Sequence, residues 1–323
     1  MRKNSAWLPL SAIASCVMLF SSCQKSFVAE SEKPAPYSTA VVSSDVVNYG
    51  EVIGNMELPW DQQFDGVSCR DINTQYLRGN RSQIPVREGN YAVRMTVRPG
   101  DVEPGTSGGE RCEMNHYKDI QHGYTQEKPG DDFVYGFSMY MPTNWVTPPG
   151  WCIVAQWHHR SASLPPIAIH MAGNTMGIQF YTGLLKQMPS TWYANYTVNQ
   201  GYTFLNNPAK GVWHDFMIRI KFSPNYDGLV EIWHKLQWEK SFRGVFTKKN
   251  FPTMQLYTQA QWPSLDSDNH PRAPDNRLPW GNYVTTQLFT RMGLYRAPSS
   301  GTSVLYFDNW ARARWWSDIA NNF

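Results

Sequence analysis

Pairs of polar residues recur in this sequence at spacings that would put both side chains on one face of a β-strand, where side chains alternate with a period of two. The pairs are Arg111 with Glu113, Gln156 with His158, Arg219 with Lys221, and Arg291 with Tyr295. Polar residues opposite an apolar strand face usually meet only solvent. These four pairs deserve interest because their combined chemistry fits one type of reaction.

The set could cleave a carbon–oxygen bond by elimination next to a carboxylate. Such a step needs a group that neutralises the carboxylate, a base that removes the neighbouring proton, and an acid that protonates the leaving oxygen. Arg111 and Gln156 suit the first task. His158 suits the second task and Tyr295 the third. We therefore expect β-elimination from an acidic polysaccharide, in which a uronate loses its C5 proton and its C4 oxygen and becomes a 4,5-unsaturated end.

Further polar side chains are expected to bind the substrate rather than to transfer protons. These candidates are Glu113, Arg219, Lys221, Arg291 and His170. On a strand, His159 would face away from His158, and we assign it no role. The sequence has neither the His-Glu-x-x-His nor the Cys-x-x-Cys spacing of common metal sites. We expect no metal and no cofactor.

The segments around these residues alternate apolar and polar side chains, which predicts half-buried strands. The clearest span residues 91–97, 133–141 and 216–222, and further candidates span 153–158, 167–171, 176–181, 229–234, 289–295 and 304–310. Turn clusters rich in Gly and Pro separate them, and helical periodicity is scarcely visible. This pattern predicts an all-β fold in which two antiparallel sheets form a β-sandwich of the jelly-roll kind.

The first residues have the features of a bacterial export signal. Arg2 and Lys3 precede an apolar run over residues 6–20 that is too short to cross a membrane, and small residues follow. We expect residues 1–22 to be a signal peptide and Cys23 to become the lipidated first residue. An ordinary cleaved signal with a free cysteine is the alternative. The mature protein would then be held in the cell envelope, in the periplasm or at the outer membrane, by its lipid.

The rest of the chain has the composition of one linker and one domain. Residues 23–44 are rich in Ser, Pro, Glu, Lys and Ala, and they predict a flexible linker. Residues 45–323 contain no second linker and no repeat, so we expect a single domain. Cys69, Cys112 and Cys152 lie in it, and we interpret each as a buried, small apolar residue.

The overall composition favours a carbohydrate partner. Aromatic residues make up 14% of the chain and charged residues only 17%, and aromatic faces stack well on sugar rings. The net charge is a mild +3, with no Lys/Arg run and no nucleic-acid-binding motif. We expect an acidic polysaccharide as the partner, no nucleic acid, and membrane contact only through the lipid at Cys23.

Seven segments resemble the heparin lyase I-like superfamily of polysaccharide lyases, which includes glucuronan lyases and is related in fold to alginate lyases. They are GERCEM (109–114), DFVYGFSMYMP (132–142), IVAQWH (153–158), PPIAI (165–169), WHDFMIRIKFS (213–223), FTRMGLYR (289–296) and VLYFDNWA (304–311). The resemblance implies a jelly roll with a long substrate cleft on its concave sheet. It implies that Gln156 contacts the carboxylate and that His158 and Tyr295 are catalytic. Arg111 and Glu113 match the Arg-(Ser/Thr)-Glu run of alginate lyases.

Two other classes of function stay open at this point. A non-catalytic surface glycan-binding lipoprotein would share the sandwich, the aromatic residues and the anchor, but would need neither a base nor an acid. A jelly-roll glycoside hydrolase needs two carboxylates close together, and Glu113 has no obvious partner. For a lyase, heparin or heparan sulfate, glucuronan, alginate or another uronate glycan would each fit, and the mild net charge favours a less sulfated one.

Overall fold

The computed structural model describes residues 64–67, 74–78, 85–88, 91–102, 109–116, 127–159, 164–187, 195–258, 260–261, 277–320 and 323. The chain divides into two units, residues 1–37 and 38–323, and all described residues belong to the second unit. The expected signal peptide, the lipid site at Cys23, the linker and Cys69 lie outside the described residues.

Seventeen strands form two sheets in the described part of the chain. The ten-stranded sheet has the order β1 (Phe64–Val67), β4 (Glu110–His116), β16 (Phe289–Arg296), β6 (Cys152–His158), β7 (Ile167–Ala172), β8 (Thr175–Gln187), β13 (Gln255–Thr258), β15 (Tyr283–Thr286) and β14 (Arg277–Trp280), while β9 (Asn195–Asn206) also pairs with β8. The seven-stranded sheet has the order β12 (Arg243–Phe251), β11 (Gly228–Leu236), β10 (Val212–Lys221), β5 (Asp132–Met141), β17 (Ser303–Ala313), β3 (Tyr91–Val97) and β2 (Thr74–Arg78).

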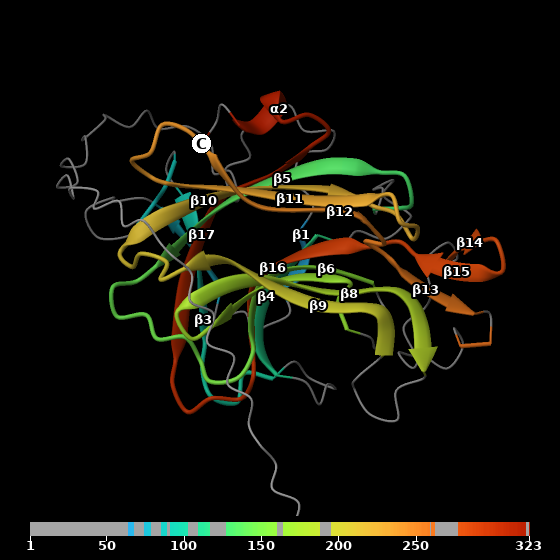
Figure 1. Ribbon diagram of the computed structural model, residues 1–323. Helices are drawn as coiled ribbons and strands as arrows, with labels where there is room; N and C mark the ends of the chain where they lie inside the picture. The colour runs from blue at the N-terminus through green and yellow to red at the C-terminus, as the bar shows by residue number, and fades with distance from the viewer. Residues whose placement is uncertain are drawn as a thin grey trace, which may run out of the picture. The chain divides into compact units, whose positions relative to one another are not determined.

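The two sheets pack face to face around one apolar core. Figure 1 shows β5, β10, β11 and β12 in one layer above β16, β6, β8 and β9 in the other. Phe137 and Phe216 from the first sheet share this core with Trp157 and Ile169 from the second. Each large apolar side chain contributes about 1.5–3 kcal/mol when it is fully buried. The predicted β-sandwich is therefore confirmed.

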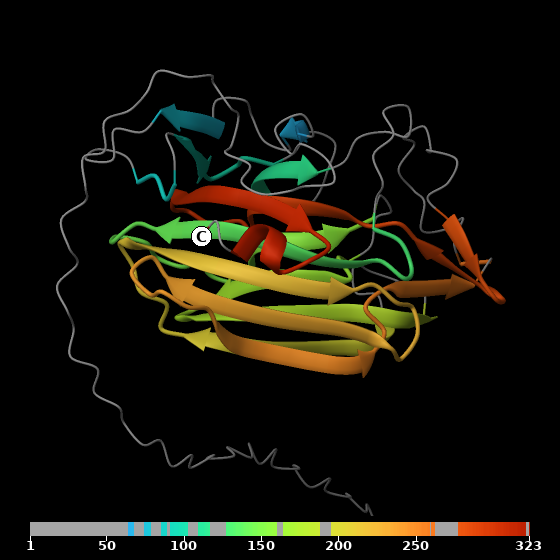
Figure 2. The ribbon, with the colours of Figure 1, turned by 90° about the horizontal axis from the view of Figure 1, so that it is seen from above.

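The end of the chain covers part of the outer face of the seven-stranded sheet. Helix α2 (Ser317–Ala320) lies against this face in Figures 1 and 2. Ile319 of this helix belongs to a second apolar cluster with Val134 of β5 and Met217 of β10. These strands are consequently buried on both faces, although strict alternation predicts one exposed face. No helix within the described ranges is long and apolar enough to cross a membrane.

Two of the cysteines that were predicted to be buried lie among the described residues. Cys112 lies in β4, and Cys152 is the first residue of β6. Both have 0% exposure, and both belong to the main core cluster. The expectation that they pack as small apolar residues is confirmed.

Gly293 gives β16 its local shape. Its φ is +150°, a region that residues with a side chain rarely adopt. A Cβ here would also come within 2.2 Å of the backbone oxygen of Cys112. At this point the register of β16 against β6 shifts, between Met292 and Tyr295, while the pairing of β16 with β4 stays regular. Gly293 therefore allows β16 to pair with β4 and with β6, although its register shifts against β6 only.

Candidate active site

Three neighbouring strands, β4, β16 and β6, bring six predicted site residues together in the ten-stranded sheet. The six are Arg111, Glu113, Gln156, His158, Arg291 and Tyr295. Tyr295 lies directly opposite Arg111, and Arg291 lies directly opposite Gln156. Residues opposite each other in an antiparallel pair share a sheet face. The predicted grouping of these residues is therefore present, with His158 and Tyr295 toward its two ends.

Glu113 occupies the centre of the group and is only 1% exposed. Its Oε1 accepts a hydrogen bond of 2.5 Å from Nε2 of Gln156. Its Oε2 lies 4.0 Å from Nη1 of Arg111 and 3.9 Å from Nη1 of Arg291. Removing a buried partner of this kind leaves uncompensated charge. Glu113 therefore contacts the other three side chains and is shielded from solvent, and its expected role in substrate binding stays a prediction.

The ring of Tyr295 is held by two neighbours. The guanidinium carbon of Arg111 lies 3.9 Å from the ring centroid, which is a cation–π contact. Trp151 packs against the same ring in a T-shaped arrangement, with 4.5 Å between centroids. Trp151 is 41% exposed, so it can also offer its surface to a sugar.

Trp151 is a site residue that sequence reasoning missed. It immediately precedes β6, and its indole approaches β4 across the sheet, at Gly109. A Cβ at Gly109 would come within 2.3 Å of that indole. Gly109 therefore leaves the space that Trp151 occupies. No local pattern could have indicated this contact, because the two residues are far apart in the sequence.

His158 has the protonation state that a general base requires. Its Nδ1 contacts the backbone oxygen of His159. A carbonyl oxygen only accepts, so Nδ1 donates the hydrogen and Nε2 keeps its lone pair. Burial, followed by the positive charge of Arg291, lowers the pKa of His158 well below 6.5. The imidazole is therefore neutral at neutral pH, and part of it remains accessible to solvent.

The neighbouring histidines have different surroundings. His170 of β7 lies opposite Ile153 of β6 and is half-buried, and burial lowers its pKa. His170 lies one strand beyond the six residues on β4, β16 and β6, which we call the central group. An extended polymer bound along the sheet could reach it. His159 is buried and contacts Gln255 and the hydroxyl of Tyr257. His159 follows the end of β6, and its ring centroid lies 5.5 Å from that of His158, so the expectation that it faces away from His158 is not confirmed.

Arg219 and Lys221 do not join this group. Both lie on β10 in the seven-stranded sheet. Arg219 forms hydrogen bonds of 2.9 and 2.8 Å with the carboxylate of Asp132, and Nζ of Lys221 lies 2.8 Å from Asp227. Both were expected to bind the substrate, but they lie on the other sheet from Gln156. Alternation fixes the strand face that a residue occupies, but it does not fix which sheet the strand joins.

Across the ranges that the structure describes, no three His, Cys, Asp or Glu side chains are grouped so that they could hold a metal ion.

Replacing Arg291 by Met should raise the pKa of His158. The positive charge of Arg291 is the second cause of the depression, and burial, the first cause, remains. The pKa should therefore move toward 6.5 without exceeding it. NMR titration of the imidazole of His158 measures the change. Arg219→Met removes the same charge from the other sheet and should leave His158 unchanged; equal titration curves in both variants would contradict the assignment.

Solved structures with a similar fold include three lyases. An endo-β-1,4-glucuronan lyase from the fungus Trichoderma reesei is 18% identical, with a TM-score of 0.54, and the match covers 84% of this chain and 98% of that one. An alginate lyase from a Chlorella virus is 13% identical (TM-score 0.45; 78% and 92% covered). An alginate lyase from Aplysia kurodai is 11% identical (TM-score 0.44; 77% and 91% covered). The first of these matches supports a jelly-roll lyase fold.

No curated protein matches this sequence. Residues 59–311 match the family described as polysaccharide lyase. This match includes all of β4, β6 and β16, and thus every residue of the central group. The chain belongs to the polysaccharide lyase family.

Proposed function

We propose that this lyase cleaves a polysaccharide containing uronate units by β-elimination and leaves 4,5-unsaturated uronate ends. One observation carries the proposal. His158 keeps an unprotonated Nε2 on the sheet that also presents the guanidinium of Arg111 and the phenol of Tyr295. The structural neighbour from Trichoderma reesei is a glucuronan lyase, and glucuronan is a uronate polymer, which is consistent with this substrate class.

The proposed reaction assigns one task to each group. Arg111 and the amide of Gln156 neutralise the uronate carboxylate, so that charge developing at C5 can spread into it. Nε2 of His158 takes the C5 proton. The electron pair forms the C4–C5 double bond and expels the C4 oxygen, which takes the proton of the Tyr295 hydroxyl. His158 has then gained one proton and Tyr295 has lost one, and exchange with solvent restores both.

The carboxylate arrangement disfavours hydrolysis. A glycoside hydrolase uses two carboxyl groups about 5–10 Å apart on either side of the bond. Glu113 is buried between two guanidinium groups and already accepts a hydrogen bond from Gln156. A non-catalytic glycan-binding protein would need neither a neutral imidazole nor a phenol on this sheet. The same residues therefore favour a lyase over both alternatives.

A finer assignment is to the heparin lyase I-like superfamily. It is supported by three of the resembling segments, residues 109–114, 153–158 and 289–296, which form the adjacent strands β4, β6 and β16. Within this group, the pair of guanidinium groups suits a carboxylated unit, and the net charge of +3 favours a less sulfated polymer.

A panel of purified polysaccharides tests the proposal directly. Glucuronan, alginate, heparan sulfate and an uncharged glucan should be compared, with near-ultraviolet absorbance reporting unsaturated ends. At least one uronate polymer should be cleaved and the glucan should not. Cleavage in heavy-oxygen water should add no label to the new reducing end. Incorporation of label there would mean hydrolysis and would reject the proposal.

Tyr295→Phe should reduce turnover by roughly 10²-fold or more, which is the usual size of an acid–base contribution. The ring keeps its contacts with Arg111 and Trp151, so substrate affinity and thermal stability should change little. Tyr226→Phe, at a position that is 69% exposed, is the matched control and should be fully active. If Tyr295→Phe kept near-normal turnover, Tyr295 would be a stacking surface and not the acid.

We also propose that the chain is exported and anchored in the cell envelope by a lipid on Cys23. The charged start, the short apolar run and the small residues before Cys23 support this. In a bacterial host fed with labelled palmitate, the wild type should carry the label in the membrane fraction. Cys23→Ser should lose the label without losing lyase activity. An unlabelled wild type would favour an ordinary cleaved signal.

A further inference from the structure

A cavity opens at one end of the sandwich, and its volume is about 190 Å³. Met141 at the end of β5 and Met171 of β7 form its floor, so both sheets contribute to it. Met171 follows His170, and successive strand residues point to opposite faces. Met171 belongs to the core, whereas His170 is outside it. A ligand in this cavity would therefore not lie on the sheet face that carries the central group of six residues.

The walls of the cavity are fixed by backbone hydrogen bonds. The turn between β7 and β8 meets the turn between β9 and β10, where the N–H of Asn207 donates to the carbonyl of Asn174 at 2.7 Å. The N–H of Gly211 donates to the carbonyl of Met141 at 2.7 Å. Asn207 has a φ of +47°, a left-handed conformation that Asn tolerates better than most residues. The cavity is thus a feature of the folded backbone and not a gap between mobile side chains.

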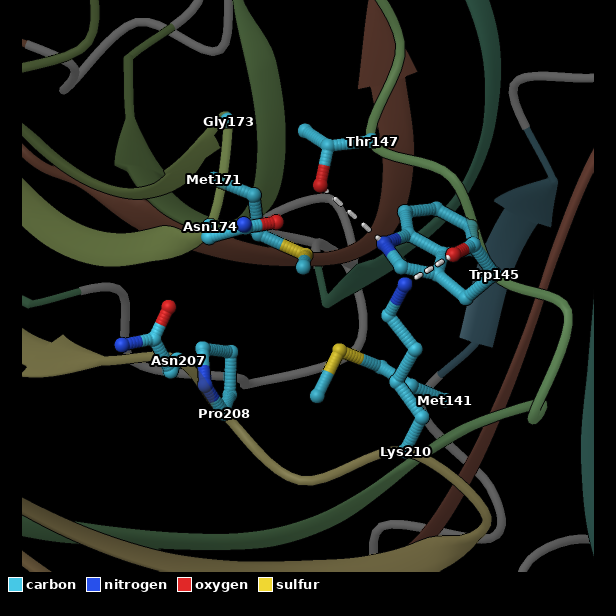
Figure 3. Close-up of a pocket in the computed structure, with 9 residues that line it drawn as sticks. All are labelled: Met141, Trp145, Thr147, Met171, Gly173, Asn174, Asn207, Pro208 and Lys210. Carbon is cyan, nitrogen blue, oxygen red and sulfur yellow. Dashed lines mark hydrogen bonds between the residues drawn. The ribbon is translucent and has the colours of Figure 1, made fainter.

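The rim of the cavity carries one cation and two carboxamides. Figure 3 shows Lys210, Asn174 and Asn207 around the opening, with Trp145 and Thr147 on the side of Lys210. Nζ of Lys210 donates one hydrogen bond of 2.6 Å to the carbonyl of Trp145. An ammonium group has three donors, so two remain. Within the described ranges Lys210 has no carboxylate within ion-pair distance, in contrast to Lys221 and Lys235.

We propose that this cavity is a second sugar-binding site that takes a single carboxylated sugar unit. Lys210 binds the carboxylate, and the carboxamides of Asn174 and Asn207 bind hydroxyls, above a floor formed by the buried side chains of Met141 and Met171. The volume is below the ~300–1,000 Å³ of sites for drug-sized ligands, so the cavity holds one unit and not an oligosaccharide. The inference rests on the proposed function, because a uronate polymer supplies such units.

Such a site would keep a long polymer close to the enzyme. A polymer bound at the cavity raises the effective concentration of its other units at the catalytic group, without any new contact there. Lys210→Met should therefore raise KM several-fold for a long uronate polymer. It should change neither kcat nor the KM for a short oligosaccharide that cannot reach both sites.

Direct binding tests the assignment independently of catalysis. Glucuronate and glucose are titrated into the full chain and followed by saturation-transfer NMR, in an Arg111→Met background that weakens the catalytic group's own affinity for carboxylates. Glucuronate should bind, and glucose should bind at least about tenfold more weakly, because one charge-assisted hydrogen bond is lost. Adding Lys210→Met should weaken glucuronate binding by roughly tenfold. Adding Lys240→Met, an exposed lysine in the turn between β11 and β12, should not.

The outcomes separate this proposal from the proposed function. If Lys210→Met and Lys240→Met bind glucuronate equally, or if the Arg111→Met parent does not bind it, the cavity is not a uronate site. That result would leave the elimination reaction untouched. If Lys210-dependent binding is found but no polymer in the panel acquires unsaturated ends, the elimination reaction fails and the sugar-acid site stands.

Discussion

The register of β16 between β4 and β6 is the constraint on which the site depends. Its pairing with β4 sets Tyr295 against Arg111, and its pairing with β6 sets Arg291 against Gln156. Because side chains alternate along a strand, a slip of one residue would turn Tyr295 into the core. The positive φ of Gly293 allows the register of β16 to shift against β6 while it stays regular against β4. The backbone geometry of β16 therefore determines how far apart Tyr295 and His158 lie.

The charges of the site do two tasks at once. Arg111 and Arg291 place positive charge beside Glu113, and after burial the positive charge of Arg291 is the next cause that lowers the pKa of His158. In the proposed elimination, a lower pKa makes His158 a weaker base but keeps it unprotonated. Neutralisation of the uronate carboxylate would compensate, because it would make the C5 proton easier to remove. The carboxylate of Glu113 compensates the positive charges of Arg111 and Arg291, which lowers the cost of burying them.

Much of the fold could be predicted because it is encoded locally. Alternation in residues 133–141 and 216–222 identified β5 and β10, and the grouping of Gln156 and His158 followed from their spacing. The order of strands within the sheets is not local, which is why alternation could not show that Arg219 and Gln156 lie on different sheets. The contact of Trp151 with Tyr295 could not be predicted either, because it joins segments that are far apart in the sequence. The export signal and the single domain stay predictions.

The two buried cysteines lie in the strands on either side of β16. Burial raises the pKa of Cys152 to about 12, and Cys112 is equally inaccessible, with 0% exposure. Oxidants and disulfide exchange act on an accessible thiolate, and neither residue offers one. Each strand that flanks β16 therefore carries a cysteine that an oxidant in solution cannot reach in the folded protein.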